Sequence, residues 1–311
     1  MKTPLGEFPV FDAHVHFFSA RFFQKLIDPI RDRYAPEDPY VAMGQQLGIE
    51  LPEGDPERLA GRWVTELDKH GVDRALLLAS APGEDEGVAA AVAAHPKRFN
   101  GLFMVDPTQP GAEDRVRHGL GDLRLSGIAL FPAMHHFSAA DDSLMPIYHT
   151  CATRSALVFV HFGHLKIALR DRLGIASKFD MRFANPLDLH RPAKEFPMIN
   201  FQIPHFGCGF FRELLMLGDM CGNVYVDTSS SNAWAQRLIE HPLTLRDLFE
   251  RSLAVFGRSR ILFGTDSGVF PRGWRADIFR DQVQVLQDLK VPATSAADIL
   301  GGNLSHLLDQ S

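Results

Sequence analysis

Residues 8–18 of the chain read FPVFDAHVHFF, an apolar run that ends in two histidines separated by one residue. The run has the length and the aromatic and β-branched content of a strand. Alternate residues of a strand lie on one side of it, so the side chains of His14 and His16 point the same way, with Cα atoms about 6.6 Å apart. The sequence therefore predicts a strand whose end presents two imidazoles to a common centre.

Seven similar runs follow, and stretches with helical signals separate them. Together with the first, the runs cover residues 8–15, 74–80, 100–105, 127–131, 156–161, 199–205, 223–227 and 260–266. Several are continuously apolar, as strands buried on both faces should be, and alternation of strand with helix is typical of a parallel sheet. We therefore predict an α/β fold, a TIM-type (β/α)8 barrel, in a chain of 311 residues that is somewhat longer than such a barrel needs.

One interval breaks this alternation. Between His16 and Arg74 lie 57 residues, including the aromatic and arginine-rich stretch FFSARFFQKLIDPIRDRY. Long loops of this kind are usually functional or disordered. We expect a helical insertion after the first strand, with residues 17–62 as a lid over the barrel mouth or as an interface segment. No linker divides residues 1–311, so we expect a single domain.

Composition limits the partners. The net charge of -6, without a dense run of lysine and arginine, argues against nucleic acid. No apolar stretch reaches the ~18 residues of a membrane span, and the N-terminus lacks the apolar core of a signal peptide. Three cysteines without a CxxC pair fit reduced thiols. We expect a cytoplasmic protein with a small-molecule substrate and no membrane or nucleic-acid partner.

Three further strand ends carry groups suited to chemistry. The runs at 156–161, 199–205 and 260–266 end in His161, His205 and Asp266. In a barrel of this type the carboxyl ends of the strands form the active-site face. Three imidazoles and a carboxylate suit Zn²⁺, and also Mn²⁺, Fe²⁺ or Co²⁺. We predict that His14, His16, His161 and Asp266 hold one divalent metal ion, and we favour zinc.

The remaining polar groups have more than one reading. His205 is either a fifth ligand or, as we favour, a catalytic group outside the ligand set that stabilises negative charge on the substrate. Asp12 and Asp227 are expected to orient ligand imidazoles or the backbone. Candidate anchors for a substrate carboxylate are three arginines of the first loop, Arg21, Arg31 and Arg33.

At this point the sequence resembles the amidohydrolase-2 family, typified by aminocarboxymuconate semialdehyde decarboxylase. The resemblance rests on DAHVH (12–16), VHFGH (160–164), PHFGCG (204–209), VYVDTS (224–229), FGTD (263–266) and ILGGNLSHLL (299–308). It implies a site for one metal ion, since the fourth strand, GIALFP, lacks the lysine of binuclear relatives. It further implies that His14, His16, His161 and Asp266 are metal ligands and that His205 is catalytic, and it suggests a homodimer.

The expected activity follows from these residues. We expect a metal-dependent hydrolase of a small organic substrate, carboxylated or cyclic, which acts through a metal-activated water with Asp266 as proton acceptor. The alternative is a nonoxidative decarboxylase of an aromatic or muconate-type acid at the same site. A second alternative is a barrel that the metal stabilises without catalysis. The sequence does not identify the substrate.

Overall fold

The central feature of the computed structural model is a sheet of eight parallel strands, in which each strand pairs with the next along the chain. The structure describes residues 1–230, 232–238 and 241–309. The strands are β3 (Phe11–Phe17), β4 (Arg74–Ala79), β5 (Phe99–Val105), β6 (Gly127–Leu130), β7 (Leu157–Val160), β8 (Phe201–Ile203), β9 (Val224–Asp227) and β10 (Ile261–Leu262). All eight predicted runs are therefore strands of one sheet.

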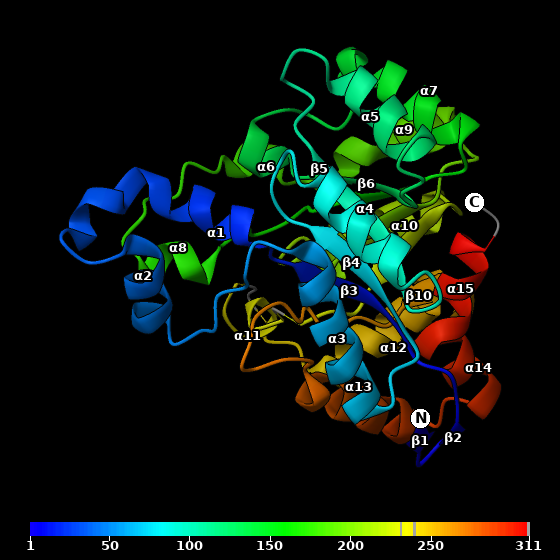
Figure 1. Cartoon of the computed structure of the whole chain (residues 1–311). Helices are drawn as coiled ribbons and strands as arrows, with labels where there is room; N and C mark the ends of the chain where they lie inside the picture. The colour runs from blue at the N-terminus through cyan, green and yellow to red at the C-terminus, as the bar shows by residue number, and fades with distance from the viewer. Residues whose placement is uncertain (231, 239–240, 310–311) are drawn as a thin grey trace.

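The sheet closes into a barrel where its last strand meets its first. Beyond the short ladder of β10, the backbone bonds Ala13 N to Phe263 O (2.8 Å), Asp266 N to His14 O (3.0 Å) and His16 N to Ser267 O (2.7 Å) join the two edges. Helices surround the barrel (Figure 1). The predicted TIM-type barrel is confirmed.

Side chains alternate between the inside and the outside of the barrel. On β4, Leu76 and Leu78 belong to the apolar cluster of the interior. The neighbouring Ala75, Leu77 and Ala79 belong to the outer cluster, which packs beneath the helices. This period of two is what a strand covered on both faces requires.

Helices connect most of the strands. The longer ones are α1 (Ala20–Ile27), α2 (Pro39–Leu47), α3 (Pro56–His70), α4 (Asp85–Ala94), α5 (Ala112–Gly121), α7 (Met145–Thr153), α10 (Phe211–Met220), α12 (Leu245–Phe256) and α13 (Ala276–Asp288). The shorter ones are α6 (Pro132–His135), α8 (Ala168–Arg172), α9 (His190–Glu195), α11 (Trp234–Arg237), α14 (Ala293–Ala297) and α15 (Asn303–Leu308). Among the described residues, no helix has the length and apolar character needed to cross a bilayer.

The segment between β3 and β4 forms helices α1 and α2, joined by a 3₁₀ helix at Asp28–Tyr34, before α3 returns to the barrel beside α4. The first helices stand together with α8 at one side of the barrel (Figure 1). Gln46 Nε2 donates to Arg172 O (3.0 Å), and Arg172 Nη2 donates to Gln46 O (3.2 Å). A separate apolar cluster fills this unit, with Phe22, Phe23, Leu26, Ile27, Ile30, Met43, Leu47, Ala81 and Leu173. The insertion and the loop after β7 thus pack as one body.

The amino end of the barrel is covered by the C-terminal helices. Leu304, Leu307 and Leu308 of α15 belong to the interior cluster. A π-helical turn at Asp298–Gly302 precedes α15, and Gly301 lies so close to the first strand that an added Cβ would sit 2.9 Å from Pro9 O. Close backbone approach therefore requires glycine here.

The chain begins with a hairpin of β1 (Lys2–Thr3) and β2 (Gly6–Glu7), which precedes the barrel. Its turn places Met1 N 2.6 Å from Phe8 O and Phe8 N 3.0 Å from Met1 O. The first residues of the predicted run 8–15 therefore connect this hairpin to the barrel, and the strand itself begins at Phe11.

Candidate metal centre at the carboxyl end of the barrel

His14 and His16 lie on β3 with their rings 5.0 Å apart. His14 Nδ1 is 2.9 Å from Asp227 Oδ2, and His16 Nδ1 is 2.6 Å from Ser80 Oγ. Because Ser80 Oγ donates to Leu78 O, it is free to accept from His16. Both rings are therefore held through Nδ1, so that each Nε2 is available to another partner.

Asp266 lies directly against these two Nε2 atoms. Its Oδ1 is 3.0 Å from His16 Nε2 and 3.9 Å from His14 Nε2. Burial alone would raise the pKa of Asp266, but the hydrogen bond with His16 and the neighbouring imidazoles outweigh it, so the pKa lies below its usual range. The carboxylate is thus ionised when it faces the imidazoles.

His14 Nε2 is buried and has no hydrogen-bond partner among the described residues. A buried polar nitrogen without a partner is costly. Burial lowers the pKa of His14, but Asp227 and Asp266 outweigh it and raise the pKa. In the neutral ring, with Nδ1–H directed to Asp227, Nε2 presents a lone pair toward a second acceptor, Asp266. A cation between them would satisfy both groups, so the residues present fit a divalent metal.

His205 follows β8 and approaches the same centre. Its ring lies 5.0 Å from that of His14, and one donor atom each of His14, His205 and Asp266 lie within 4.8 Å of one another. Burial lowers the pKa of His205, which keeps the ring neutral. The sequence favoured a place outside the ligand set for His205 and left a role as fifth ligand open, and by distance His205 belongs to this group of three donors.

His161, at the end of β7, is buried at the edge of this group. Its ring is 5.3 Å from that of His205 and stacks on Phe131 at 5.4 Å. Its Nδ1 has no hydrogen-bond partner among the described residues. Burial, reinforced by the nearby histidines, lowers its pKa well below the usual value. A neutral, unpartnered imidazole is suited to metal ligation, although His161 is not within the 4.8 Å group.

Two buried residues of the β9 end connect the histidines. Asp227 accepts from Gln202 Nε2 (2.9 Å) as well as facing His14, as expected for a residue that orients an imidazole. Ser229 Oγ lies 2.8 Å from His205 Nδ1 and 3.1 Å from His14 Nδ1. Ser229 was not predicted as a site residue from the sequence, where its signal was its place two residues after the strand-end Asp227.

Asp12 supports the backbone beneath the site. Its Oδ1 accepts from the backbone N–H groups of His14 (2.9 Å) and Thr265 (3.1 Å), and its Oδ2 accepts from Trp274 Nε1 (2.8 Å). Burial raises the pKa of Asp12 to about 6. The residue joins the first strand to the turn that carries Asp266.

The turns that carry His205 and Asp266 have unusual backbone conformations. His205 has φ 55° and Asp266 has φ 59°, both in the left-handed region. This region is unfavourable for residues other than glycine, so the backbone is strained at both positions. Backbone strain of this kind is often found at functional sites. Trp234 Nε1 holds the first turn by donating to His205 O at 3.1 Å.

Two of the three arginines expected to anchor a substrate carboxylate have other partners, and the third, Arg21, lines a separate cavity with Glu84. Arg31 forms an exposed pair with Asp28 (2.8 Å), and Arg33 donates to Leu173 O (3.1 Å). Instead, Arg275 donates through Nη1 to Ser230 Oγ (2.6 Å), which donates to Asp266 Oδ2 (3.2 Å). Its sequence signal was its position in the segment directly after the strand-end aspartate.

Cys208 plays no evident chemical part in this centre. Its buried thiol donates to His164 O at 3.1 Å. Burial raises the pKa of Cys208 to about 12, so the reactive thiolate is scarce near neutral pH.

Comparison with known proteins adds a family assignment. A family model described as amidohydrolase matches residues 11–304. A search of curated proteins gave no match.

Solved structures share the fold over nearly the whole chain. One is 5-carboxyvanillate decarboxylase from Sphingomonas paucimobilis, with 18% identity, a TM-score of 0.66, and coverage of 97% of this chain and 99% of that one. Another is the Novosphingobium aromaticivorans 5-carboxyvanillate decarboxylase with manganese and 4-hydroxy-3-methoxy-5-nitrobenzoic acid (15% identity, TM-score 0.66, coverage 97% and 96%). A third is a candidate 2-pyrone-4,6-dicarboxylic acid hydrolase from Pseudomonas putida (18% identity, TM-score 0.60, coverage 97% and 98%).

Proposed function

We propose, since this chain belongs to the amidohydrolase family, that its barrel mouth catalyses metal-dependent hydrolysis of a small, planar, carboxylated substrate. The observation that carries the proposal is the meeting of Asp266 Oδ1 with the Nε2 atoms of His14 and His16. The Nδ1 atom of each imidazole is held by a hydrogen bond, His14 to Asp227 and His16 to Ser80. The two Nε2 atoms are thus left as potential metal ligands opposite the Asp266 carboxylate.

In this proposal His14, His16, His161 and Asp266 hold one divalent ion. When bound, the ion would supply Lewis acidity and lower the pKa of a water molecule toward neutrality. Imidazole and carboxylate donors suit both Zn²⁺ and Mn²⁺. The sequence favoured zinc, and manganese is the metal in one of the similar structures. Elemental analysis of the purified protein distinguishes the two.

The roles of the chain's own groups follow from their hydrogen bonds. His14 donates through Nδ1 to Asp227, so the Ser229 hydroxyl is free to donate to His205 Nδ1. His205 then carries its proton on Nε2 and can donate it to negative charge that develops on a substrate oxygen. Asp266 Oδ1 accepts the proton of the attacking water, while Ser230 holds Oδ2.

Decarboxylation is the second candidate, because it would use the same site. Two of the similar structures are carboxyvanillate decarboxylases, and their TM-scores exceed that of the pyrone hydrolase candidate. The reaction needs proton delivery to carbon in place of proton removal from water. Asp266, ionised and surrounded by imidazoles, is better suited to accept a proton, which is why we place hydrolysis first.

A substrate panel separates the two reactions. Metal-loaded enzyme is incubated with pyrone, muconate and hydroxybenzoate carboxylic acids, and products are followed by mass spectrometry together with CO2 release. Hydrolysis adds the mass of water, and the product takes up ¹⁸O from labelled water. Release of CO2 without that gain in mass would reverse our order. Turnover by neither route in a fully metal-loaded protein would favour a barrel that the metal only stabilises.

We also propose that residues 17–62 serve as a lid within a single domain of residues 1–311. The support is the apolar cluster that this segment shares with the connection after β7. Because residues of the same chain bury this apolar surface, the segment does not need a partner subunit to cover it. A homodimer would be detected by light scattering. The three free, buried cysteines fit the cytoplasmic location that we propose.

A further inference from the structure

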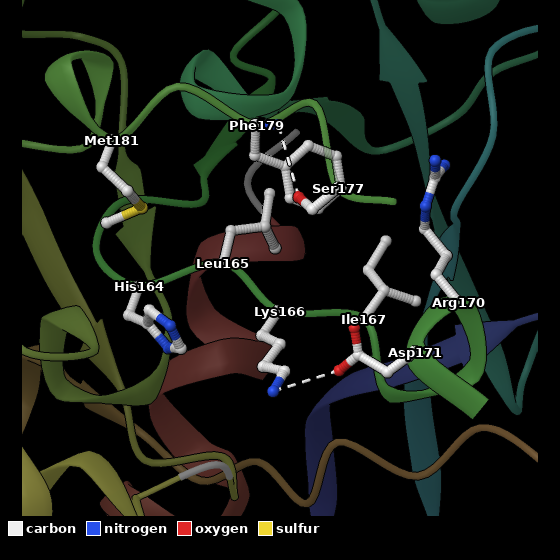
Figure 2. A pocket seen from close by; sticks show the side chains of 9 residues that line it. All are labelled: His164, Leu165, Lys166, Ile167, Arg170, Asp171, Ser177, Phe179 and Met181. Carbon is white, nitrogen blue, oxygen red and sulfur yellow. Dashed lines mark hydrogen bonds and ion pairs between the residues drawn. The ribbon is translucent and has the colours of Figure 1, made fainter. Parts of the chain in front are cut away.

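A cavity of about 320 Å³ lies beside α8, between the loop after β7 and residues 177–181. We call it the α8 pocket. Its walls include three basic side chains, His164, Lys166 and Arg170, and a single acidic one, Asp171 (Figure 2). Its volume is at the lower end of the range for small-molecule sites.

The two strong cations of the pocket differ in their partners. Lys166 Nζ pairs with Asp171 Oδ2 at 3.2 Å, and Figure 2 shows these two side chains meeting while the guanidinium of Arg170 is turned away from them. Arg170 Nη2 donates to Ala176 O (3.1 Å), but its Nε is buried without a hydrogen-bond partner. Within the described residues Arg170 has no ion pair. The pocket therefore contains an uncompensated guanidinium with donors to spare.

The remaining walls suit a planar group. Leu165, Ile167 and Phe179 line the cavity, and the Arg170 guanidinium carbon lies 5.8 Å from the centroid of the Phe179 ring. In Figure 2 these apolar side chains occupy the space between His164 and Arg170. An aromatic or conjugated ring can pack on such a surface while its carboxylate meets the guanidinium, which binds carboxylates through two parallel hydrogen bonds.

The loop that lines the pocket also begins at the metal centre. His164 is the third residue after His161, and its backbone N donates at 2.7 Å to the carbonyl of Cys208, in the turn that carries His205. Leu165 packs on the interior cluster that includes Phe131, the ring against His161. None of the groups proposed to hold the metal lines the pocket.

We propose that the α8 pocket binds a carboxylate on the planar part of the substrate remote from the bond that is cleaved, with Arg170 as the anion-binding residue. This inference rests on the proposed function, because it names the class of substrate for that site. Lys166 contributes less, since Asp171 already neutralises it. The pair is exposed, and such pairs stabilise little, so Lys166 can be released by a competing carboxylate or by loss of Asp171.

The test uses isophthalate, a planar dicarboxylate, and 1,3-benzenedimethanol, its uncharged analogue, in calorimetric titrations of the metal-loaded enzyme. We expect isophthalate to bind and the diol not to bind measurably. Arg170→Met should weaken isophthalate binding about ten- to hundredfold, the value of a hydrogen-bonded charge. Asp171→Asn should strengthen it several-fold, because Lys166 is then unpaired.

Arg212→Met is the matched control, because it removes the same charge from an exposed position on α10. It should leave the affinity unchanged. Since Asp171→Asn acts in the opposite direction, a folding defect in Arg170→Met cannot imitate the whole pattern. Equal affinity of the wild type and a folded Arg170→Met variant would overturn the inference, as would binding of the diol as tight as that of isophthalate.

Failure of the inference is distinguishable from failure of the proposed function. If the protein takes up metal and turns over a substrate, but isophthalate binding ignores Arg170, only the pocket assignment is wrong. If Arg170 governs isophthalate binding in a protein that shows no metal-dependent turnover, the pocket assignment stands and the hydrolytic proposal is wrong.

Discussion

The two ends of the barrel are built from the same strands yet differ in chemistry. At the amino end, the leucines of α15 extend the apolar interior, and Gly301 permits a close backbone contact. At the carboxyl end, buried histidines and carboxylates gather on turns in which His205 and Asp266 have left-handed backbone. The difference indicates that stability is concentrated at one end, which allows costly polar groups and strain at the other.

The largest expected difference between the chemistry at the carboxyl end and the stability of the barrel is the effect of Asp266→Asn. It removes the charge that faces two imidazoles, and so it should abolish stoichiometric metal binding and lower kcat/KM by more than about 10³-fold, as expected for one member of a catalytic unit. Elemental analysis and turnover measure this, and circular dichroism should show an intact barrel. Full metal content in the variant would contradict the proposed ligand set.

Ser229→Ala tests the hydrogen bonds behind the metal centre. Asp227 still holds His14, so metal should stay bound, but His205 loses the group that fixes its tautomer. Removal of such supporting partners costs about 10–100-fold in activity. Ser126→Ala is the control, since that hydroxyl accepts from Asn100 near the amino end of the barrel. A Ser229→Ala enzyme as active as the wild type would remove Ser229 from the mechanism.

At the amino end, Gly301→Val should affect stability and leave chemistry alone. The new side chain would press on the carbonyl of Pro9, and overpacking typically costs about 1–3 kcal/mol of unfolding free energy. Chemical denaturation measures the loss, and metal content should be unchanged. Gly302→Ala is the matched control, because its Cβ would meet nothing nearer than 3.4 Å. Equal destabilisation by both variants would argue against the close contact.

The last expected effect is a dependence of stability on pH through Asp12. Its pKa is about 6 when folded, against a value of 3.8 for the free side chain. Between these values the folded state binds more protons than the unfolded one, so stability from this group falls as pH rises from about 4 to 6. The slope is at most about 1.4 kcal/mol per pH unit. Urea unfolding of the wild type and Asp12→Asn should diverge over that window, and parallel curves would exclude the effect.

Much of the barrel was readable from sequence because local patterns specify it. The eight apolar runs became eight strands, and the strand ends bearing His14, His161, His205 and Asp266 all lie at the carboxyl end. The predicted start of the first strand, at Phe8, was wrong, because Phe8 pairs with Met1 at the base of the preceding hairpin and the strand begins at Phe11. The strands of that hairpin have two residues each, too few for a recognisable alternation of polar and apolar residues.

The supporting groups were harder to foresee, because they act across strands. Ser80, directly after β4, meets His16, and Ser229, two residues after β9, meets His14 and His205. Only the closed barrel brings these groups together. The arginines show the same limit. Arg170 lies on the short helix α8 and Arg275 directly before α13, in connections whose course depends on tertiary packing, whereas composition drew attention to the first loop.

The backbone bonds between the first and last strands have a consequence for biosynthesis. Asp266 N donates to His14 O, so the seam of the barrel runs through the proposed metal centre. While the chain is still being made, the histidines of the first strand exist without the carboxylate that completes their site. The full donor set forms only after the last strand has emerged and joined the first. Tight loading of the ion therefore requires that synthesis has passed the last strand of the barrel.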